Sequence, residues 1–333
     1  LVKSIDKNKG SAESKKVLDI LVPFLMGPKG LNSDAEEVRD FSLQTVITLV
    51  KDCNPQAIQK YIPSLIEDLC LLLSSLEPQM INYVALNADK YDINMNLLDA
   101  KRAHQANESP IMDTIEKLIE MVEPASYEQL FDAVVTTVRK AVGLPSKVGA
   151  AKLIKLCCTK APVEILPSSG KFLKVCLNNL KNSNNEMITS AYAVAFGCLF
   201  KNAPLSKMIK YSEKLVALYF EPSSSRAVDL NNKLASGVAI QAIVNYSPSQ
   251  FEQVKGIFIP FVFVSRNFAQ SSLRGDETDQ VSKTTRRING VFQHIWTEST
   301  SNSEADTIQY YLDEIIKINA QHIKSNDFKV RVM

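Results

Sequence analysis

The chain has 333 residues, 45% hydrophobic and 22% charged, which is an ordinary composition for a folded protein. Its 38 basic and 36 acidic side chains nearly cancel, so we expect neither nucleic acid nor an anionic membrane surface as a partner. No apolar run approaches the roughly 20 residues needed to cross a bilayer, so we expect no direct membrane insertion. The chain starts at Leu1 without a signal-peptide pattern, and we interpret it as an internal piece of a longer protein.

Apolar residues recur at helical spacing along the whole chain. The spacing i, i+3, i+4, i+7 predicts helices that each bury one face. In the first helix that face would comprise Val17, Ile20, Leu21, Phe24 and Leu25. Further stripes of this kind occupy residues 58–73, 127–138, 153–161, 188–200 and 308–316. No sustained period-two alternation predicts a strand, so the predicted fold class is all-α.

Turn residues divide these helices into pairs. Gly27, Pro28 and Gly30 end the first helix, and polar residues 32–34 can cap the next. First helices are predicted to begin near residues 15, 57, 126, 169, 206, 248 and 304, and second helices near residues 34, 145, 184, 226 and 283. A recurrence of about forty residues on helical patterns indicates an α-solenoid of antiparallel hairpins, with about six to seven repeats.

Three prolines support the same period. Pro23, Pro63 and Pro260 lie in similar apolar settings, at separations close to multiples of about forty residues. Proline kinks a helix interior but is tolerated in the first turn. We therefore expect a repeated bend or helix start; the alternative is coincidence among 14 prolines.

Two polar stretches interrupt the pattern. We assign residues 1–74 to the first repeats, 75–110 to a polar insertion with a helix near 97–105, and 111–266 to continuing repeats. Residues 267–285 form a second insertion, which we expect to be mobile. Residues 286–333 would hold the terminal helices.

The residues that usually carry chemistry are isolated in this sequence. His104, His294 and His322 belong to no ligand pair, and we interpret His104 as a solvated side chain. Trp296 fits a helix face and is predicted to be in the core. No phosphate-binding glycine motif occurs. The six cysteines show no metal-ligand spacing, and we expect reduced, buried thiols at 53, 70, 157, 158, 176 and 198.

Two weaker signals involve charge. Residues 168–171, Ser-Ser-Gly-Lys, could hold an anion at a helix N-terminus, although a plain helix start is the preferred interpretation. The basic pairs Lys101–Arg102, Lys152–Lys155 and Arg286–Arg287 are scattered and balanced by acids, so we expect solvated faces. The sequence assigns no catalytic, cofactor-binding or metal-ligating residue and leaves the protein-binding residues unknown.

Six ordered segments between about residues 70 and 265 resemble one known family. They read SSLEPQ at 74–79, SPIMDTI at 109–115, VGLPSKVG at 142–149, SGKFL at 169–173, YAVAFG at 192–197 and YSP at 246–248. They are similar to the very large HEAT-repeat proteasome adaptors of the extracellular-mutant family. The family's glycine after Lys147 is Val148 here, and residues 266–303 match poorly.

The resemblance implies a fragment from the C-terminal half of such an adaptor, built as a HEAT solenoid. It implies a non-enzymatic scaffold, without cofactors, that tethers the proteasome regulatory particle, through its ATPase ring, to the core particle. It also implies a role in assembly quality control and a cytoplasmic and nuclear location. A nuclear transport receptor is one alternative, although such receptors are usually strongly acidic and this chain has a net charge of +2. A helical enzyme without a recognisable motif is the other.

Overall fold

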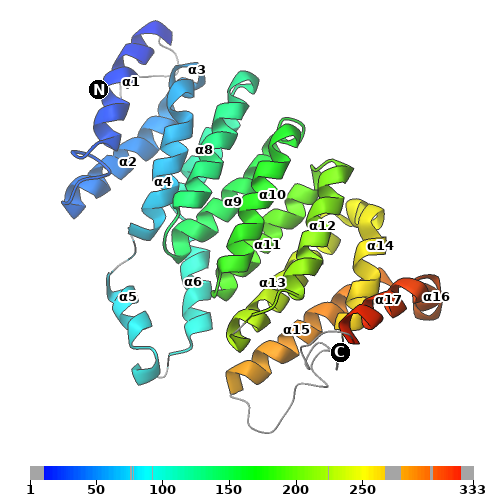
Figure 1. The fold of residues 1–333 in the computed structure, drawn as a ribbon. Coiled ribbons are helices and arrows are strands. Elements are labelled where there is room, and N and C mark those ends of the chain that lie inside the picture. The colour runs from blue at the N-terminus through cyan, green and yellow to red at the C-terminus, as the bar shows by residue number, and fades with distance from the viewer. Residues whose placement is uncertain are drawn as a thin grey trace. The chain divides into compact units, whose positions relative to one another are not determined.

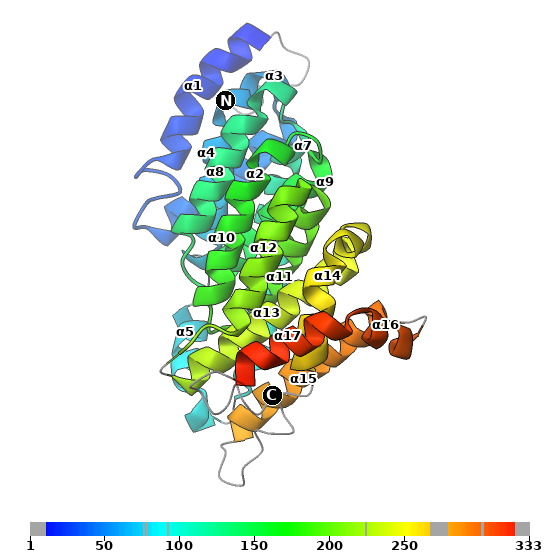
Figure 2. The same ribbon diagram turned by 45° about the vertical axis from the view of Figure 1, so that its right-hand side comes forward.

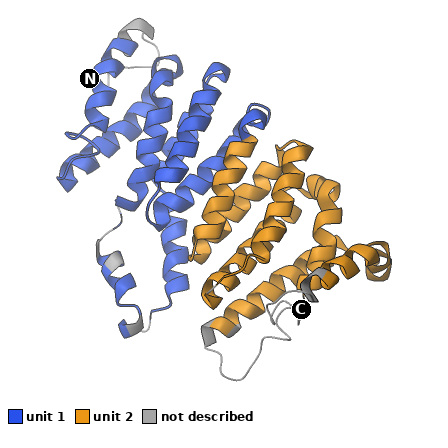
Figure 3. Ribbon diagram, in the orientation of Figure 1, with its two compact units in different colours: residues 1–168 blue, residues 169–333 orange. Residues whose placement is uncertain are grey.

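The computed structural model describes residues 11–75, 77, 79–91, 93–223, 225–266, 279–300 and 303–323. Contacts divide the chain into two compact units, Leu1–Ser168 and Ser169–Met333, which are coloured separately in Figure 3. Every regular element within the described ranges is a helix. Within those ranges no helix has the length and apolar character that crossing a membrane requires.

The first unit is a set of packed helices in which α4 is central. Helix α4 packs against α7, α8 and α9, while α6 packs against α9 and α2 against α7. The elements are α1 (Ser11–Met26), α2 (Glu36–Asp52), α3 (Pro55–Ile58), η2 (Gln59–Tyr61), α4 (Ile62–Ser75), α5 (Gln79–Leu86), η3 (Asp89–Tyr91), α6 (Met95–Asn107), α7 (Pro110–Glu120), η4 (Pro124–Ser126), α8 (Tyr127–Lys140), α9 (Leu144–Lys160) and η5 (Leu166–Ser168).

The second unit is a two-layer stack of helix pairs. One layer holds α10, α12 and α14 side by side, and the other holds α11, α13 and α15 (Figures 1 and 2). Helix α17 packs against α14. The elements are α10 (Ser169–Asn182), α11 (Glu186–Lys201), α12 (Leu205–Tyr219), α13 (Arg226–Tyr246), α14 (Pro248–Ser265), α15 (Asp279–Ser299), α16 (Glu304–Tyr310) and α17 (Leu312–Ile323).

Polar contacts between neighbouring helices repeat the period of about forty residues that the sequence indicates. In the first unit Tyr61 Oη donates to Asp19 Oδ1 at 2.6 Å, 42 residues away. In the second unit Tyr211 Oη donates to the Gly170 carbonyl at 3.0 Å, 41 residues away. Such contacts tie each hairpin to the next one along the chain. The predicted all-α solenoid of helical hairpins is therefore confirmed.

The predicted buried face of the first helix is correct at Leu25 and wrong at Ile20 and Phe24. Helix α1 buries Leu18, Val22 and Leu25, whereas Ile20 is 77% exposed and Phe24 is 54% exposed. The segment is apolar enough to offer two overlapping stripes. Packing against α2 and α3 determines which stripe is buried, so the sequence of α1 alone does not determine it.

The three prolines do not share one structural role. The stretch predicted as a single helix from about residue 57 is divided into α3, η2 and α4. Pro63 is the second residue of α4, where a missing N–H is tolerated. Pro23 and Pro260 lie inside α1 and α14. A common bend or helix start is therefore not observed.

The two predicted insertions are described in part. The polar helix expected near 97–105 is α6, which spans Met95–Asn107 and packs against α9. Helix α15 begins at Asp279, inside the range assigned to the second insertion, and residues 267–278 lie outside the described ranges. The division of the chain into repeats and insertions remains a prediction.

Candidate functional site

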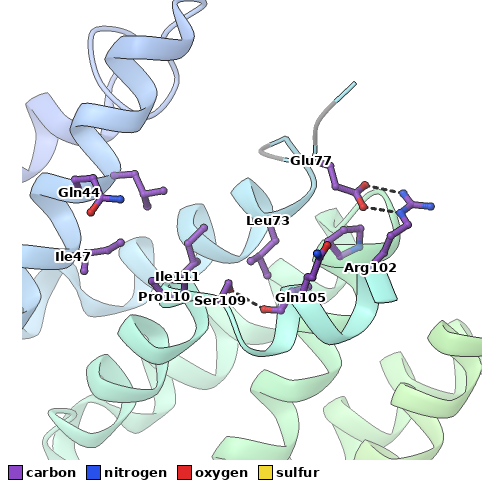
Figure 4. Close-up of a pocket in the computed structure, with 12 residues that line it drawn as sticks. Gln44, Ile47, Leu73, Glu77, Arg102, Gln105, Ser109, Pro110 and Ile111 are labelled. Carbon is purple, nitrogen blue, oxygen red and sulfur yellow. Dashed lines mark hydrogen bonds and ion pairs between the residues drawn. The ribbon is translucent and has the colours of Figure 1, made fainter. Parts of the chain in front are cut away.

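A pocket of about 280 Å³ lies in the first unit, among α2, α4, α6, α7 and the start of α9. Figure 4 shows Gln44 and Ile47 on one side of the view and Glu77 and Arg102 on the other, with Leu73 between them. The apolar lining is formed by Leu43, Ile47, Leu73, Ala106, Pro110, Ile111 and Pro145. The polar lining is formed by Gln44, Glu77, Arg102, Gln105 and Ser109.

One edge of the pocket is held by a carboxylate–guanidinium cluster (Figure 4). The Arg102 guanidinium donates to both carboxylate oxygens of Glu77, at 2.6 and 2.7 Å, and to Asp99 Oδ1 at 3.0 Å. The side chains of Arg102 and Glu77 are only 12% and 11% exposed. The bonds to Glu77 raise the pKa of Arg102. Because these N–H groups donate to Glu77 and Asp99, Arg102 holds the segment after α4 against α6 and so stabilises this edge of the pocket.

Part of the pocket lining comes from the first turns of α7 and α9, which contribute Pro110 and Pro145. Ser109 caps α7, because its Oγ accepts from the Met112 N–H at 3.3 Å, and Pro110 follows in the first turn, where proline is favoured. Ser146 joins the start of α9 to the end of α4. Its Oγ accepts from the Ser74 N–H at 3.0 Å and donates to the Leu71 carbonyl at 2.9 Å. These bonds fix the positions of Pro110 and Pro145.

We predict that Arg102→Met destabilises this edge by about 2 to 3 kcal/mol, because Glu77 is left mostly buried and without its principal cation. Hydrogen exchange in the full-length protein, read over peptides from α6, measures the loss. The matched control is Lys140→Met. The Lys140 side chain is 60% exposed in its pair with Glu67, so this change should affect stability far less. If the two substitutions destabilised the protein equally, Arg102 would not have this stabilising role.

The histidines singled out from the sequence do not converge. His104 is solvated as predicted, with its side chain 68% exposed and its Nε2 3.3 Å from Glu108, which directly follows the same helix. His294 is exposed on α15, and His322 lies among residues whose side chains are not described. Throughout the described ranges no three metal-ligating side chains gather into a site. Trp296 is in the core as predicted, 2% exposed, with its Nε1 donating to Glu304 at 3.0 Å.

The cysteine prediction agrees with the structure for all but one position. None of the six cysteines, all within the described ranges, forms a disulfide; Cys198 is partly exposed, and the other five are buried. Burial raises the pKa of Cys70 and of Cys157 to about 12. Thiols held in the protonated form are poor nucleophiles and poor metal ligands.

The basic pairs are less solvated than we expected. Arg102 is mostly buried in the cluster described above, and Lys152 donates to the Asn107 carbonyl at 2.6 Å. Arg287 Nη1 pairs with Glu186 at 2.6 Å. The other three side chains match the prediction, because Lys101, Lys155 and Arg286 are exposed. Apart from Asp99, which precedes Arg102 by three residues, the partners of the engaged side chains lie far along the chain, so charge patterning could not reveal them.

The Ser-Gly-Lys segment at 169–171 is the first turn of α10, as the plain helix-start interpretation predicts.

The sequence does not predict the pocket. Glu77 and Arg102 are 25 residues apart, and Gln44 comes from a third helix. No local spacing links such residues. The arrangement suits the non-covalent holding of a small apolar group, since its strongest polar groups already bond to one another.

Comparison with known proteins agrees with the helical-repeat fold. Residues 58–220 match the family model described as proteasome adapter and scaffold protein ECM29, HEAT-repeat domain. The chain is 44% identical over 333 residues to Proteasome component ECM29 of Saccharomyces cerevisiae. It is 28% identical over 330 residues to the human Proteasome adapter and scaffold protein ECM29, and 24% identical over 310 residues to Proteasome component ecm29 of Schizosaccharomyces pombe.

These matches cover nearly all of the chain and a small part of each relative. They include 99% of the chain for the budding yeast and human proteins and 92% for the fission yeast protein. The chain spans 17% of the length of each of these relatives. The family model matches α4 to α12, and the budding yeast protein matches the chain collinearly from end to end. The chain therefore belongs to the ECM29 family of HEAT-repeat proteins.

Proposed function

We propose that the chain is a HEAT-repeat segment of a non-enzymatic scaffold that tethers the proteasome regulatory particle to the core particle. The observation that carries the proposal is the 44% identity, along the whole chain, to a protein named as a proteasome component. The human relative is named as a proteasome adapter and scaffold. We further propose that the ATPase ring is the contact on the regulatory particle and that the protein takes part in assembly quality control, in cytoplasm and nucleus.

The fold supports tethering through stiffness. In each unit helices are packed pairwise, and bonds such as Tyr61–Asp19 and Tyr211–Gly170 tie successive hairpins together. A stiff body that carries separate weak contacts gains avidity, because the first contact raises the effective concentration of the second. Neither contact then has to be strong, and the scaffold needs no chemistry of its own.

Affinity purification of the tagged full-length protein tests the partner. We expect subunits of both the regulatory and the core particle to be recovered together. Recovery of a Ran-type GTPase with transport cargo, and no proteasome, would favour the nuclear transport alternative. Lysine cross-linking of the purified assembly should also join exposed lysines such as Lys155 to proteasome subunits; cross-links confined to the rest of the protein would assign the contact elsewhere.

A salt challenge tests tethering itself. Proteasomes purified with and without the protein are washed at rising salt, and the fraction of core particle still bound to the regulatory particle is measured. We expect that fraction to fall at lower salt when the protein is missing. Identical curves would rule out tethering even if binding is confirmed. Changing exposed His104 and His294 to alanine should leave the curves unchanged, whereas loss of a hydrolytic activity in these variants would favour an enzyme.

A further inference from the structure

Two neighbouring helices of the second unit are rich in lysine. Helix α10 has three lysines and no acidic residue, and α12 has three lysines and one glutamate, Glu213. Lys171, Lys174 and Lys181 are exposed at helical spacing on α10. On α12 the exposed lysines are Lys207, Lys210 and Lys214. The whole chain has a net charge of only +2, whereas these two helices together carry six lysines and one acidic residue.

The two rows of lysines lie side by side. Figures 1 and 2 show α10 next to α12 in both views. At one end Tyr211 of α12 bonds to the Gly170 carbonyl of α10 at 3.0 Å. At the other end Lys181 of α10 pairs with Glu221, just after α12. The helices therefore run in the same direction. We refer to Lys171, Lys174, Lys207, Lys210 and Lys214 as the α10–α12 lysine surface.

Lys207 links the two rows. A methyl group placed on Gly170 would lie 3.3 Å from Lys207 Cε. The side chain of Lys207 thus crosses from α12 onto the first turn of α10, where backbone N–H groups add partial positive charge. Positive charge gathers at this end of the surface.

Four of these lysines have no carboxylate partner among the described residues. Within the part of the chain that the structure describes, Lys174, Lys207, Lys210 and Lys214 form no ion pair, although the ammonium of Lys214 lies 5.2 Å from the Tyr211 ring centroid. Some lysines outside this surface do find carboxylates. Lys255 of α14 pairs with Glu252 at 3.3 Å, and Lys160 of α9 pairs with Glu120. Like charges left together on packed helices repel one another unless an anionic partner compensates them.

We propose that the α10–α12 lysine surface docks an acidic segment of another polypeptide. Two rows of ammonium groups complement a run of carboxylates, and such complementarity accelerates and orients docking. Leu205 and Ile209 add exposed apolar area on α12, 47% and 38% exposed. An acidic segment with interspersed apolar residues would satisfy both features. The inference extends beyond the tethering proposal and does not require the partner to be a proteasome subunit.

The surface suits a polypeptide better than a nucleic acid or a membrane. Neither α10 nor α12 contains an arginine, the residue that binds phosphate in a bidentate manner. The aromatic residues of α12, Tyr211 and Tyr219, are buried, so no ring is available for stacking on bases. The near-zero net charge of the chain also provides no broad attractive field for a polyanion or a lipid surface.

The test is fluorescence anisotropy with the full-length protein and a labelled synthetic peptide of glutamates interspersed with leucines. The test variant combines Lys174→Glu, Lys207→Glu and Lys210→Glu. The matched control combines Lys16→Glu, Lys29→Glu and Lys155→Glu, three lysines exposed in the first unit. Circular dichroism checks that both triple variants remain helical. Parallel titrations use single-stranded oligouridylate and phosphatidylcholine vesicles that contain phosphatidylserine.

We expect the test variant to weaken peptide binding about tenfold or more and the control to change it less than about twofold, with affinity falling as salt rises. Equal binding by the test variant and the unchanged protein would overturn the proposal. So would the absence of peptide binding by the unchanged protein, or tighter binding of the RNA or the vesicles that is lost in the same variant.

Discussion

Replacing Phe292 with alanine is expected to destabilise the second unit by about 3 to 5 kcal/mol, the usual cost of removing a fully buried aromatic ring. Phe292 of α15 is 0% exposed. Its ring meets Tyr219 of α12 and Phe261 of α14 edge-on, at centroid distances of 5.4 and 5.5 Å. Tyr219 and Phe261 are themselves 5.0 Å apart. Three helices therefore lose one shared contact when this single ring is removed.

Hydrogen exchange in the full-length protein measures this effect, read over peptides from α12, α14 and α15. The control is Tyr310→Ala, because Tyr310 is 78% exposed and contacts the ring of Tyr311 at 4.7 Å. It should cost less than about 1 kcal/mol. If exchange accelerated only in α15, the three helices would not be coupled through Phe292.

Gly197→Ala is expected to destabilise the second unit by up to about 3 kcal/mol, although alanine normally favours a helix. A Cβ at Gly197 of α11 would lie 2.5 Å from the Ala242 carbonyl oxygen of α13. The obstacle is backbone, so the two helices would have to move apart. That movement would also disturb the 2.6 Å bond from Ser247 Oγ to the Gly197 carbonyl.

The matched control for Gly197 is the same substitution at Gly290 of α15. No described atom lies within 4 Å of a Cβ at that position, so alanine should stabilise the helix by about 0.5 to 1 kcal/mol. Hydrogen exchange over α11 and α13, and separately over α15, gives both values. Stabilisation by both substitutions would show that α11 and α13 do not pack as closely as the structure indicates.

The positions of the helices were predictable because helix formation is local. The starts predicted near 169, 226 and 248 coincide with the first residues of α10, α13 and α14. Apolar spacing, capping residues and prolines act within one or two turns of the chain. The period of about forty residues likewise appears in the sequence, because each hairpin repeats the same local pattern.

The faces of the helices were less predictable because burial depends on neighbours. In α1 the sequence offers Ile20 and Phe24 as readily as Leu18 and Val22, and only packing against α2 and α3 covers the second set. Arg102 looks like a solvated residue in a polar stretch, yet it closes the edge of a pocket with Glu77. The pocket, made by five helices, has no signal of its own in the sequence.

By itself, the sequence determined the all-α class, the hairpin period and the family of this protein, since all three depend on local patterns and on collinear matches. Only the tertiary structure decided which side chains meet. It brought Phe292 against Tyr219 and Phe261, and it placed the lysines of α10 beside those of α12. The physical reason is the range of the forces involved. Backbone bonds and caps link residues a few positions apart, whereas packing and charge also act between residues tens of positions apart.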